Sequence, residues 1–134
     1  MAHDPQKLSL VPGEWGADAA FWLAKALASA TLLDLKRQWQ QGTKLYRVMH
    51  ESACVGAFLL RVDSTAKGPQ GVIVAAAAEL DGVDMVQTCL PAIEARFCGV
   101  RSIRFHTAKP AVARKMARMG YGPQELICVK ELAA

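Results

Sequence analysis

The feature that most constrains the fold is an almost uninterrupted apolar run, Gly71–Leu80, whose residues are GVIVAAAAEL. A run of this length and composition is typical of a β-strand that is covered on both faces. Its alanines would also let a helix or a ligand approach the backbone closely. A strand buried on both sides needs a layer of helices above and below its sheet, so we expect an α+β fold with helices on both faces.

The length and composition indicate one globular domain. The chain has 134 residues, which is within the usual size of a single domain, so we expect one domain spanning residues 1–134. Hydrophobic residues make up 52% and charged residues 21%, which excludes a disordered or fibrous chain. The net charge of +4 permits an acidic partner but does not require one.

The cysteines and histidines predict neither a metal centre nor a disulfide framework. The cysteines contain no CxxC pair and lie far in sequence from the histidines; they are Cys54, Cys89, Cys98 and Cys128. The longest apolar run is too short to span a bilayer, and no membrane partner is expected. We therefore expect free thiols and a cytoplasmic protein, for which a bacterial or phage cytoplasm is suitable.

Hydrophobic periodicity and capping residues predict the remaining elements. Their order is β-α-α-β-β-β-α-β-α-β, which indicates a mixed, mostly antiparallel sheet. The predicted strands are Lys7–Val11, Lys44–His50, Cys54–Val62, Gly71–Leu80, Ser102–His106 and Leu126–Leu132, and Asp63–Gln70 is predicted as a loop. The predicted helices are Glu14–Ala30, Leu32–Trp39, Asp84–Phe97 and Pro110–Met119.

Local signals define some helix ends and leave one open. Thr31 and Asp34 have the spacing of a capping box, and Gly42 is placed to end that helix in a left-handed turn. Pro91 leaves two alternatives for the third helix. Either the helix begins at Asp84 and Pro91 interrupts its hydrogen bonds, or Pro91 lies in its first turn and the helix is short.

The last third of the chain carries a family resemblance. The segment Gly99–Phe105, then a helix, the turn Met119-Gly120-Tyr121 and a closing strand resemble the end of the GNAT superfamily of acyl-CoA-dependent N-acyltransferases. The order of elements resembles that family over nearly the whole chain. The resemblance implies a GNAT-like domain and names acetyl-CoA as the cofactor of active relatives.

The resemblance also shows where this sequence departs from the family. The family's pyrophosphate loop, R/Q-x-x-G-x-G/A, corresponds to Glu79–Asp84, of which only Gly82 is preserved. Three carboxylates would oppose a diphosphate there. The family's general-acid tyrosine corresponds to Met116, and a cofactor-contacting asparagine corresponds to Lys109. No cofactor is therefore expected, and no catalytic residue.

These departures favour a GNAT-like protein that has lost acyl transfer and acts as a binding or structural module. Small GNAT-like proteins without the cofactor loop are encoded by bacteria and phages, so a phage-associated role is one expectation. An unidentified protein is the expected partner. In the family the first two helices line the acceptor cleft, which makes Trp22 and Trp39 candidate ligand contacts.

Two alternatives remain open. In the first, the chain is an active acyl-CoA-dependent N-acyltransferase, in which the backbone near Ala76 and Gly82 holds the cofactor and His106 or Glu51 deprotonates an amine. In the second, a basic face on the last helix binds nucleic acid weakly through phosphates. That face consists of Arg114, Lys115 and Arg118.

Overall fold

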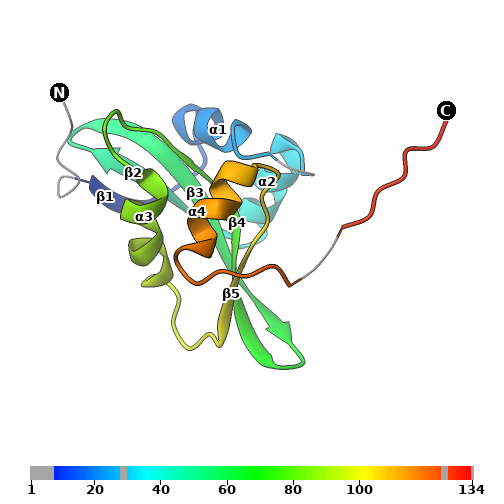
Figure 1. Ribbon diagram of the computed structural model, residues 1–134. Helices are drawn as coiled ribbons and strands as arrows, with labels where there is room; N and C mark the ends of the chain where they lie inside the picture. Colours follow the sequence, from blue (N-terminus) through cyan, green and yellow to red (C-terminus); the bar gives the residue numbers. More distant parts are fainter. Residues whose placement is uncertain (1–7, 28–29, 125–126, 134) are drawn as a thin grey trace.

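A computed structural model describes residues 8–27, 30–124 and 127–133 (Figure 1). The strands are β1 (Leu8–Gly13), β2 (Lys44–His50), β3 (Ala53–Thr65), β4 (Gly68–Ala78) and β5 (Ser102–Phe105). The helices are α1 (Ala17–Ala24), α2 (Leu32–Gln40), α3 (Met85–Glu94) and α4 (Pro110–Ala117). None of the helices within these ranges is long and apolar enough to cross a membrane.

The five strands form one sheet in the order β1-β2-β3-β4-β5. Neighbours from β1 to β4 are antiparallel, whereas β5 runs parallel to β4. Helices α1 and α2 pack on one face of this sheet and α3 and α4 on the other (Figure 1). The predicted α+β class, with a mixed and mostly antiparallel sheet between helices, is confirmed.

Strand β3 lies inside the sheet and supplies both faces. Ala57 and Leu59 are buried toward α1 and α2, and Phe58 and Leu60 toward α3 and α4, as the two-residue period of a strand requires. We call the first group the α1/α2 core: Ala19, Leu23, Leu35, Leu45, Ala57, Leu59 and Ala75. The second is the α3/α4 core: Val48, Val55, Phe58, Leu60, Ile73, Met85, Cys89, Leu90, Ile93 and Met116.

The apolar run forms most of β4, which is covered on both faces as predicted. Its pairing with β3 shifts register: Leu60 lies opposite Ile73 and Leu59 opposite Ala75, so Val74 is an extra residue in β4. Such a bulge bends a strand and increases its twist. Pairing with β5 ends at Ile73, although β4 continues to Ala78. The two parallel strands therefore separate just where the bulge lies.

Several locally coded features are confirmed. Thr31 Oγ1 accepts a hydrogen bond from the Asp34 amide, and Asp34 Oδ2 accepts one from the Thr31 amide, both at 3.2 Å. Gly42 has a φ of +111°, in the left-handed region that favours glycine. Strand β2 spans the predicted Lys44–His50 and pairs antiparallel with β3.

The segment Asp63–Gln70 is not the loop that its composition predicted. Asp63 pairs with Gln70 and Thr65 with Gly68, so β3 and β4 continue into a tight hairpin. Asp63 also accepts hydrogen bonds from the guanidinium groups of Arg61 and Arg104, at 2.9 and 3.1 Å. These contacts from neighbouring strands extend the ladder through a stretch rich in turn residues.

The boundaries of three predicted helices also change. Helix α1 is shorter than Glu14–Ala30, because Gly16 before it is fully extended (φ −158°, ψ 171°); residues 28–29 lie outside the described ranges. Pro91 lies inside α3, which excludes the first-turn alternative. Helix α3 ends at Glu94 and α4 at Ala117, each before the predicted residue.

The predicted closing strand Leu126–Leu132 is wrong over the residues that the structure describes. Residues 127–132 form no strand, and Leu126 lies outside the described ranges. The first strand is Leu8–Gly13 rather than Lys7–Val11, and Lys7 is likewise outside them. An alternating sequence supplies strand propensity, but a strand forms only where its backbone groups find a partner.

Candidate binding cavity

A cavity of about 210 Å³ opens where β4 and β5 separate. Its walls come from the end of β4, from α3 and α4, and from the segment at the end of α1. Because none of the described strands pairs with β4 beside Ala76–Ala78 on that side, side chains of the surrounding helices line the gap instead of a neighbouring strand. The alanine side chains of β4 are small, so they leave space beside the strand backbone on this side of the cavity.

The inner wall of the cavity is apolar and contains adaptable side chains. Met85, Cys89 and Leu90 of α3 line it together with Met116 of α4. Methionine is unbranched and fills irregular spaces in alternative conformations. Burial raises the pKa of the Cys89 thiol to about 11, so this thiol stays protonated at neutral pH and is a poor nucleophile.

A group of aromatic and cationic side chains forms one side of the rim. The Trp22 indole donates a hydrogen bond from Nε1 to the Cys54 carbonyl at 3.2 Å, which fixes its ring. Lys25 Nζ lies 5.1 Å from the centroid of that ring, within cation–π range. Lys109 Nζ donates to the Lys25 carbonyl at 3.0 Å and so links the start of α4 to the end of α1. A cation at the C-terminal end of α1 also complements the helix dipole.

The ends of β4 and β5 bring to the cavity further groups that could bear a proton or a charge. His106 follows β5 directly, at the point where the strands have separated, and is exposed. Thr107 is next to it in the lining, and Glu79 lies at the end of β4. The cavity therefore combines an apolar interior with a polar rim, which is the usual composition of a ligand or peptide site.

The loop before α3 is acidic and its helix N-terminus is already occupied. Asp84 is the N-cap of α3, and its Oδ1 accepts a hydrogen bond from the Gln87 amide at 3.3 Å. The same oxygen lies 3.6 Å from Lys115 Nζ. The amide hydrogen bond and the nearby lysine lower the pKa of Asp84, so the carboxylate stays ionised. Glu79 and Asp81 are exposed on the same loop.

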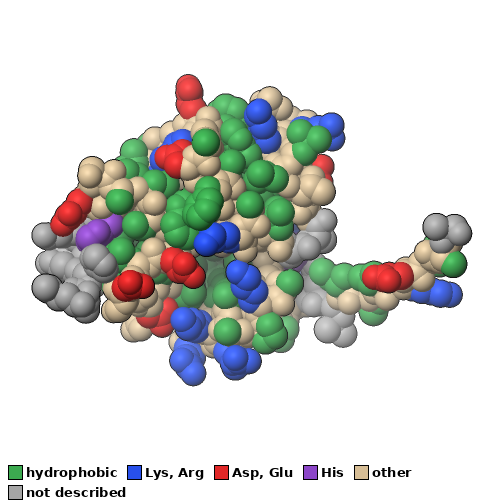
Figure 2. Space-filling model, turned by 90° about the horizontal axis from the view of Figure 1, so that it is seen from above, with side chains coloured by type: hydrophobic (Ala, Val, Ile, Leu, Met, Phe, Trp, Pro, Cys, Tyr) green, Lys and Arg blue, Asp and Glu red, His purple; other side chains and the backbone are tan. Residues whose placement is uncertain are grey.

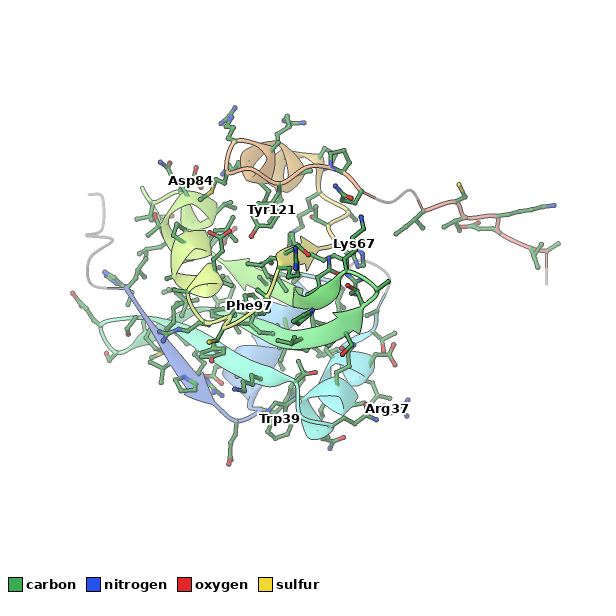
Figure 3. The ribbon with its side chains drawn as sticks, turned by 90° about the horizontal axis from the view of Figure 1, so that it is seen from below. Arg37, Trp39, Lys67, Asp84, Phe97 and Tyr121 are labelled. Carbon is green, nitrogen blue, oxygen red and sulfur yellow. The ribbon has the colours of Figure 1, made fainter. Side chains whose placement is uncertain are left out.

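The turn after α4 is attached to α3 by a polar contact. The Tyr121 hydroxyl donates to Glu94 Oε2 at 2.7 Å, and burial together with Glu94 raises the pKa of Tyr121. Tyr121 packs against the α3/α4 core and is not part of the cavity lining. Figure 3 shows Asp84 and Tyr121 on one side of the sheet and Trp39 on the other.

The structure brings together only some of the site residues predicted from the sequence. Trp22, Ala76 and His106 line one cavity. Trp39 instead packs in the α1/α2 core, with its ring 6.3 Å from that of Trp15. Glu51 lies in the β2–β3 turn with a φ of +58°, and neither it nor Gly82 is in the lining.

The predicted basic face is present on α4 but is not uniform. Arg114 and Arg118 are exposed, whereas Lys115 is paired with Asp84. Nucleic-acid binding by this face remains a prediction: affinity should fall steeply with salt and weaken when Arg114 and Arg118 are neutralised together. A response that is flat with salt would contradict it.

Known structures share this architecture although sequence comparison finds no relative. No protein-family model matches the chain, and no curated protein does. The aminoglycoside N-acetyltransferase AAC(6')-Iy in complex with CoA is similar with a TM-score of 0.65 and 8% identity, covering 95% of both chains. An aminoglycoside acetyltransferase from an uncultured soil metagenomic sample, in complex with sisomicin, gives 0.65 and 13%, covering 96% of this chain and 98% of that one.

A third structure of similar fold belongs to the GNAT family. A GNAT family acetyltransferase from Elizabethkingia anophelis with acetyl-CoA bound has a TM-score of 0.58 and 15% identity, covering 87% of this chain and 75% of that one. The chain has the GNAT acetyltransferase fold. At such identities the similarity concerns the fold, and the chemistry of the GNAT-fold site has to be argued from this chain's own residues.

Sequence reasoning missed much of the cavity of this GNAT fold. Lys25 lies in an alanine-rich helical stretch, and Met85 and Leu90 read as ordinary core positions. No local signal could have selected them, because they share a site only where β4 leaves β5. The family resemblance drew attention to Lys109, but it did not predict the contact of this lysine with the end of α1.

Proposed function

We propose that this chain is a GNAT-fold binding domain that does not transfer acyl groups from coenzyme A and that takes an apolar side chain of a protein partner into the cavity between β4 and β5. The observation that carries the proposal is Asp84 at the start of α3. Its carboxylate accepts a hydrogen bond from the Gln87 amide. A cofactor phosphate bound at this helix N-terminus would need that amide as a donor.

Electrostatics oppose a coenzyme diphosphate at this loop. Two like unit charges about 4 Å apart repel by roughly 1 to 4 kcal/mol at a wet protein surface. Asp84, Glu79 and Asp81 would each face the incoming phosphates, and Lys115 offsets one of these charges through its ion pair. The residues at this position therefore do not fit the cofactor of active GNAT proteins.

Three side chains near the cavity are unsuited to act as the general acid of acyl transfer. Met116 stands where the family resemblance places a tyrosine, and a thioether has no proton to donate. Tyr121 is near in sequence, but its hydroxyl is committed to Glu94. Cys89 is protonated and buried in an apolar wall.

The size of the cavity supports a protein partner. Its volume of about 210 Å³ is below the range of roughly 300–1,000 Å³ that is usual for complete small-molecule sites. A cavity of about 150 Å³ lined by apolar groups accepts benzene. The cavity thus suits one or two apolar side chains inserted from a partner surface, with Lys25 and Lys109 on its rim available for acidic neighbours of that anchor.

One observation favours an alternative, acyl-CoA-dependent N-acylation of an amine. His106 is exposed and lines the same cavity as Ala76–Ala78, the part of β4 beyond its pairing with β5, where a base could meet an acceptor amine. Structures of similar fold are bound to CoA and acetyl-CoA. In this alternative Lys115 would turn from Asp84 toward a phosphate.

Calorimetric titration with acetyl-CoA separates the two functions. The native chain is expected to give no saturable heat at millimolar acetyl-CoA. The double variant Glu79→Arg with Asp84→Gly should gain measurable binding, because it removes two anions and frees an amide. Glu131→Arg makes the same charge change as Glu79→Arg at an exposed position outside the loop before α3 and serves as the control for that substitution.

Micromolar binding by the native chain that Gly82→Trp abolishes would establish the alternative and overturn the proposal. The partner site has its own test, in which the chain selects peptides from a displayed random library. Enriched peptides should share one large apolar residue and lose binding to Ala76→Leu, which fills the cavity. Enrichment that is indifferent to Ala76→Leu would place the partner elsewhere.

A further inference from the structure

The turn that joins β3 to β4 and the start of β5 form a second hollow, whose lining shares no residue with that of the cavity. Its volume is about 430 Å³, and its lining residues are Thr65, Ala66, Lys67, Gly68, Arg101 and Ser102. The lining contains neither a carboxylate nor an aromatic ring. Figure 3 shows Lys67 well apart from Asp84, which begins α3, so this hollow is distinct from the acidic loop.

The two cations of the hollow have no ionic partner among the described residues. Lys67 and Arg101 are exposed, and neither forms an ion pair within the part of the chain that the structure describes. Asp63, two residues before the turn, accepts hydrogen bonds from Arg61 and Arg104 instead. Figure 2 shows a different arrangement on the face seen from above, where acidic side chains lie next to basic ones. The hollow therefore has a local excess of positive charge.

The turn holds the stem of the Arg101 side chain in place. Gly68 has a φ of +112°, in the left-handed region that favours glycine. A Cβ at this position would lie 2.7 Å from Arg101 Cδ, so the arginine stem packs directly on the glycine backbone. The Arg101 amide also donates a hydrogen bond to the Pro69 carbonyl at 2.9 Å. Because its stem is already held, the guanidinium group loses less conformational freedom when it binds a ligand.

The hydroxyl groups of the lining have different tasks. Thr65 Oγ1 donates to the Gly68 carbonyl at 2.6 Å and accepts from the Lys67 amide at 3.3 Å, which fixes the turn. Ser102 Oγ accepts from Gln70 Nε2 at 3.0 Å, so its hydroxyl hydrogen remains available for a further acceptor. A guanidinium, an ammonium and a hydroxyl donor therefore line one hollow, and together they favour an oxyanion.

We propose that this hollow binds the dianionic phosphate group of a small polar molecule. A phosphate monoester carries about −1.5 to −2 charges at pH 7 and has three acceptor oxygens, which matches two cations and a hydroxyl donor. A carboxylate would leave one cation without a counter-charge. The volume of the hollow lies within the range of roughly 300–1,000 Å³ that is usual for small-molecule sites. Nucleic acid is disfavoured, because the lining offers no aromatic ring on which a base could stack.

A bound phosphate would connect two segments that lie far apart in the sequence. Lys67 is in the β3–β4 turn, whereas Arg101 directly precedes β5. Strand β5 pairs with β4 only from Ser102 to Phe105, so a ligand at Arg101 would attach the start of this short strand to the turn. Binding is therefore expected to raise the temperature of thermal unfolding, since the ligand binds only the folded chain. The site does not depend on what the cavity binds.

A titration of the ¹⁵N-labelled full chain, followed by NMR at constant ionic strength, tests the proposal. The probes are inorganic phosphate and glycerol 3-phosphate. Saturable shifts are expected for the amide signals of Lys67, Gly68, Arg101 and Ser102. Tighter binding of glycerol 3-phosphate would identify an ester as the preferred source of the phosphate group. Equal binding of the two probes would identify free phosphate, and either result supports the site.

Variants of the two cations show whether these side chains carry the binding. Arg101→Gln should weaken glycerol 3-phosphate binding about tenfold or more, because it removes charge-assisted hydrogen bonds. Arg101→Lys keeps the charge and should retain part of the affinity. Lys67→Gln should weaken binding by a smaller factor, because a lysine contributes a hydrated point charge. Lys44→Gln removes another exposed lysine, at the start of β2 and outside the lining, and should leave the affinity unchanged.

Two kinds of result would overturn the phosphate site. The first is the absence of saturable shifts with either probe, or binding that is indifferent to both Arg101→Gln and Lys67→Gln. The second is displacement of glycerol 3-phosphate from these amides by a lower concentration of a single-stranded oligonucleotide. That result would make the hollow part of a nucleic-acid surface instead.

Discussion

The two faces of the sheet are packed by different means, although they share the same strands. In the α1/α2 core, Ala19, Leu23, Ala57 and Leu59 are completely inaccessible. Small side chains on α1 and on β3 let the helix lie close to the sheet, and the leucines fill the remaining space. The side chains of this core therefore leave no accessible space between α1 and the sheet at these positions.

The cavity lies in the gap between β4 and β5, and Trp22, Ala26 and Ala57 border it from the α1/α2 side. Its inner wall comes from the α3/α4 core, which has methionine or cysteine at several positions. Helices α3 and α4 cover the part of the sheet where β4 leaves β5, and none of the strands described by the structure fills the gap beneath them. Ala75 and Ala76 are neighbours in β4, yet the first belongs to the closed core and the second to the cavity wall. Adjacent side chains of one strand can thus have different roles: one packs in a closed core, and the next lines a binding cavity.

The strongest test of this difference is a matched pair of leucine truncations. Leu23→Ala is expected to cost about 3–5 kcal/mol of unfolding free energy, because it opens a void in a closed core. Leu90→Ala should cost about 2–3 kcal/mol, since Leu90 already borders the cavity and the truncation enlarges a space that is open to solvent or ligand. Urea denaturation followed by circular dichroism measures both. Equal losses would mean that the two cores are packed alike.

A second pair enlarges side chains at adjacent residues. Ala75→Leu should destabilise the chain by about 1–3 kcal/mol, because the α1/α2 core has no room for a larger group. Ala76→Leu should be neutral or stabilising, because the added carbons enter the cavity. Thermal unfolding of the two variants under identical conditions gives the comparison. A larger loss for Ala76→Leu than for Ala75→Leu would contradict the assignment of the faces.

On the α3/α4 face, the hydrogen bond between Tyr121 and Glu94 adds to stability. Its removal should lower the free energy of unfolding by less than the core substitutions above. Tyr121→Phe removes the hydrogen bond to Glu94 while keeping the ring, and should cost about 1–2 kcal/mol, since the acceptor is charged and both groups are only half-buried. Combining it with Glu94→Gln in a double-mutant cycle isolates the contact. Additive losses would show that the two side chains do not stabilise each other.

The smallest effect is expected at the edge of the α1/α2 face. Arg47 donates two hydrogen bonds to Asp18, both at 2.9 Å, and lowers the pKa of Asp18 from 3.8 to about 2. The carboxylate is half-exposed, so Asp18→Asn should cost less than about 1 kcal/mol at neutral pH. Because the folded-state pKa is the lower one, this contribution is complete above pH 3.8 and lost as the pH falls toward 2. Thermal melts of native and variant chains should therefore converge over that interval, and a difference that grows with acid would refute the assignment.

Whether an element could be predicted from the sequence depends on how far apart in the chain the residues lie that form it. Thr31 and Asp34 cap α2 through contacts three residues apart, and β2 and β3 form a hairpin across a short turn, so the sequence predicted both. The Asp63–Gln70 hairpin was missed because its turn residues suggested a loop, while Arg104 from a distant strand holds Asp63 in the ladder. Trp39 illustrates the same limit for the site, since a tryptophan can face a core or a cleft from the same helical position.

The sequence by itself determined the helices, the hairpin and the doubly covered strand, because capping, periodicity and turn chemistry act within a few residues. It also determined the acidic character of the loop before α3. Tertiary structure alone decided that β4 and β5 part after Ile73, that Trp22, Lys25 and His106 line one cavity, and that residues 127–132 form no strand with the other described residues. Each of these depends on backbone partners and packing across distant segments, and no local pattern specifies which partner a strand or a side chain will find.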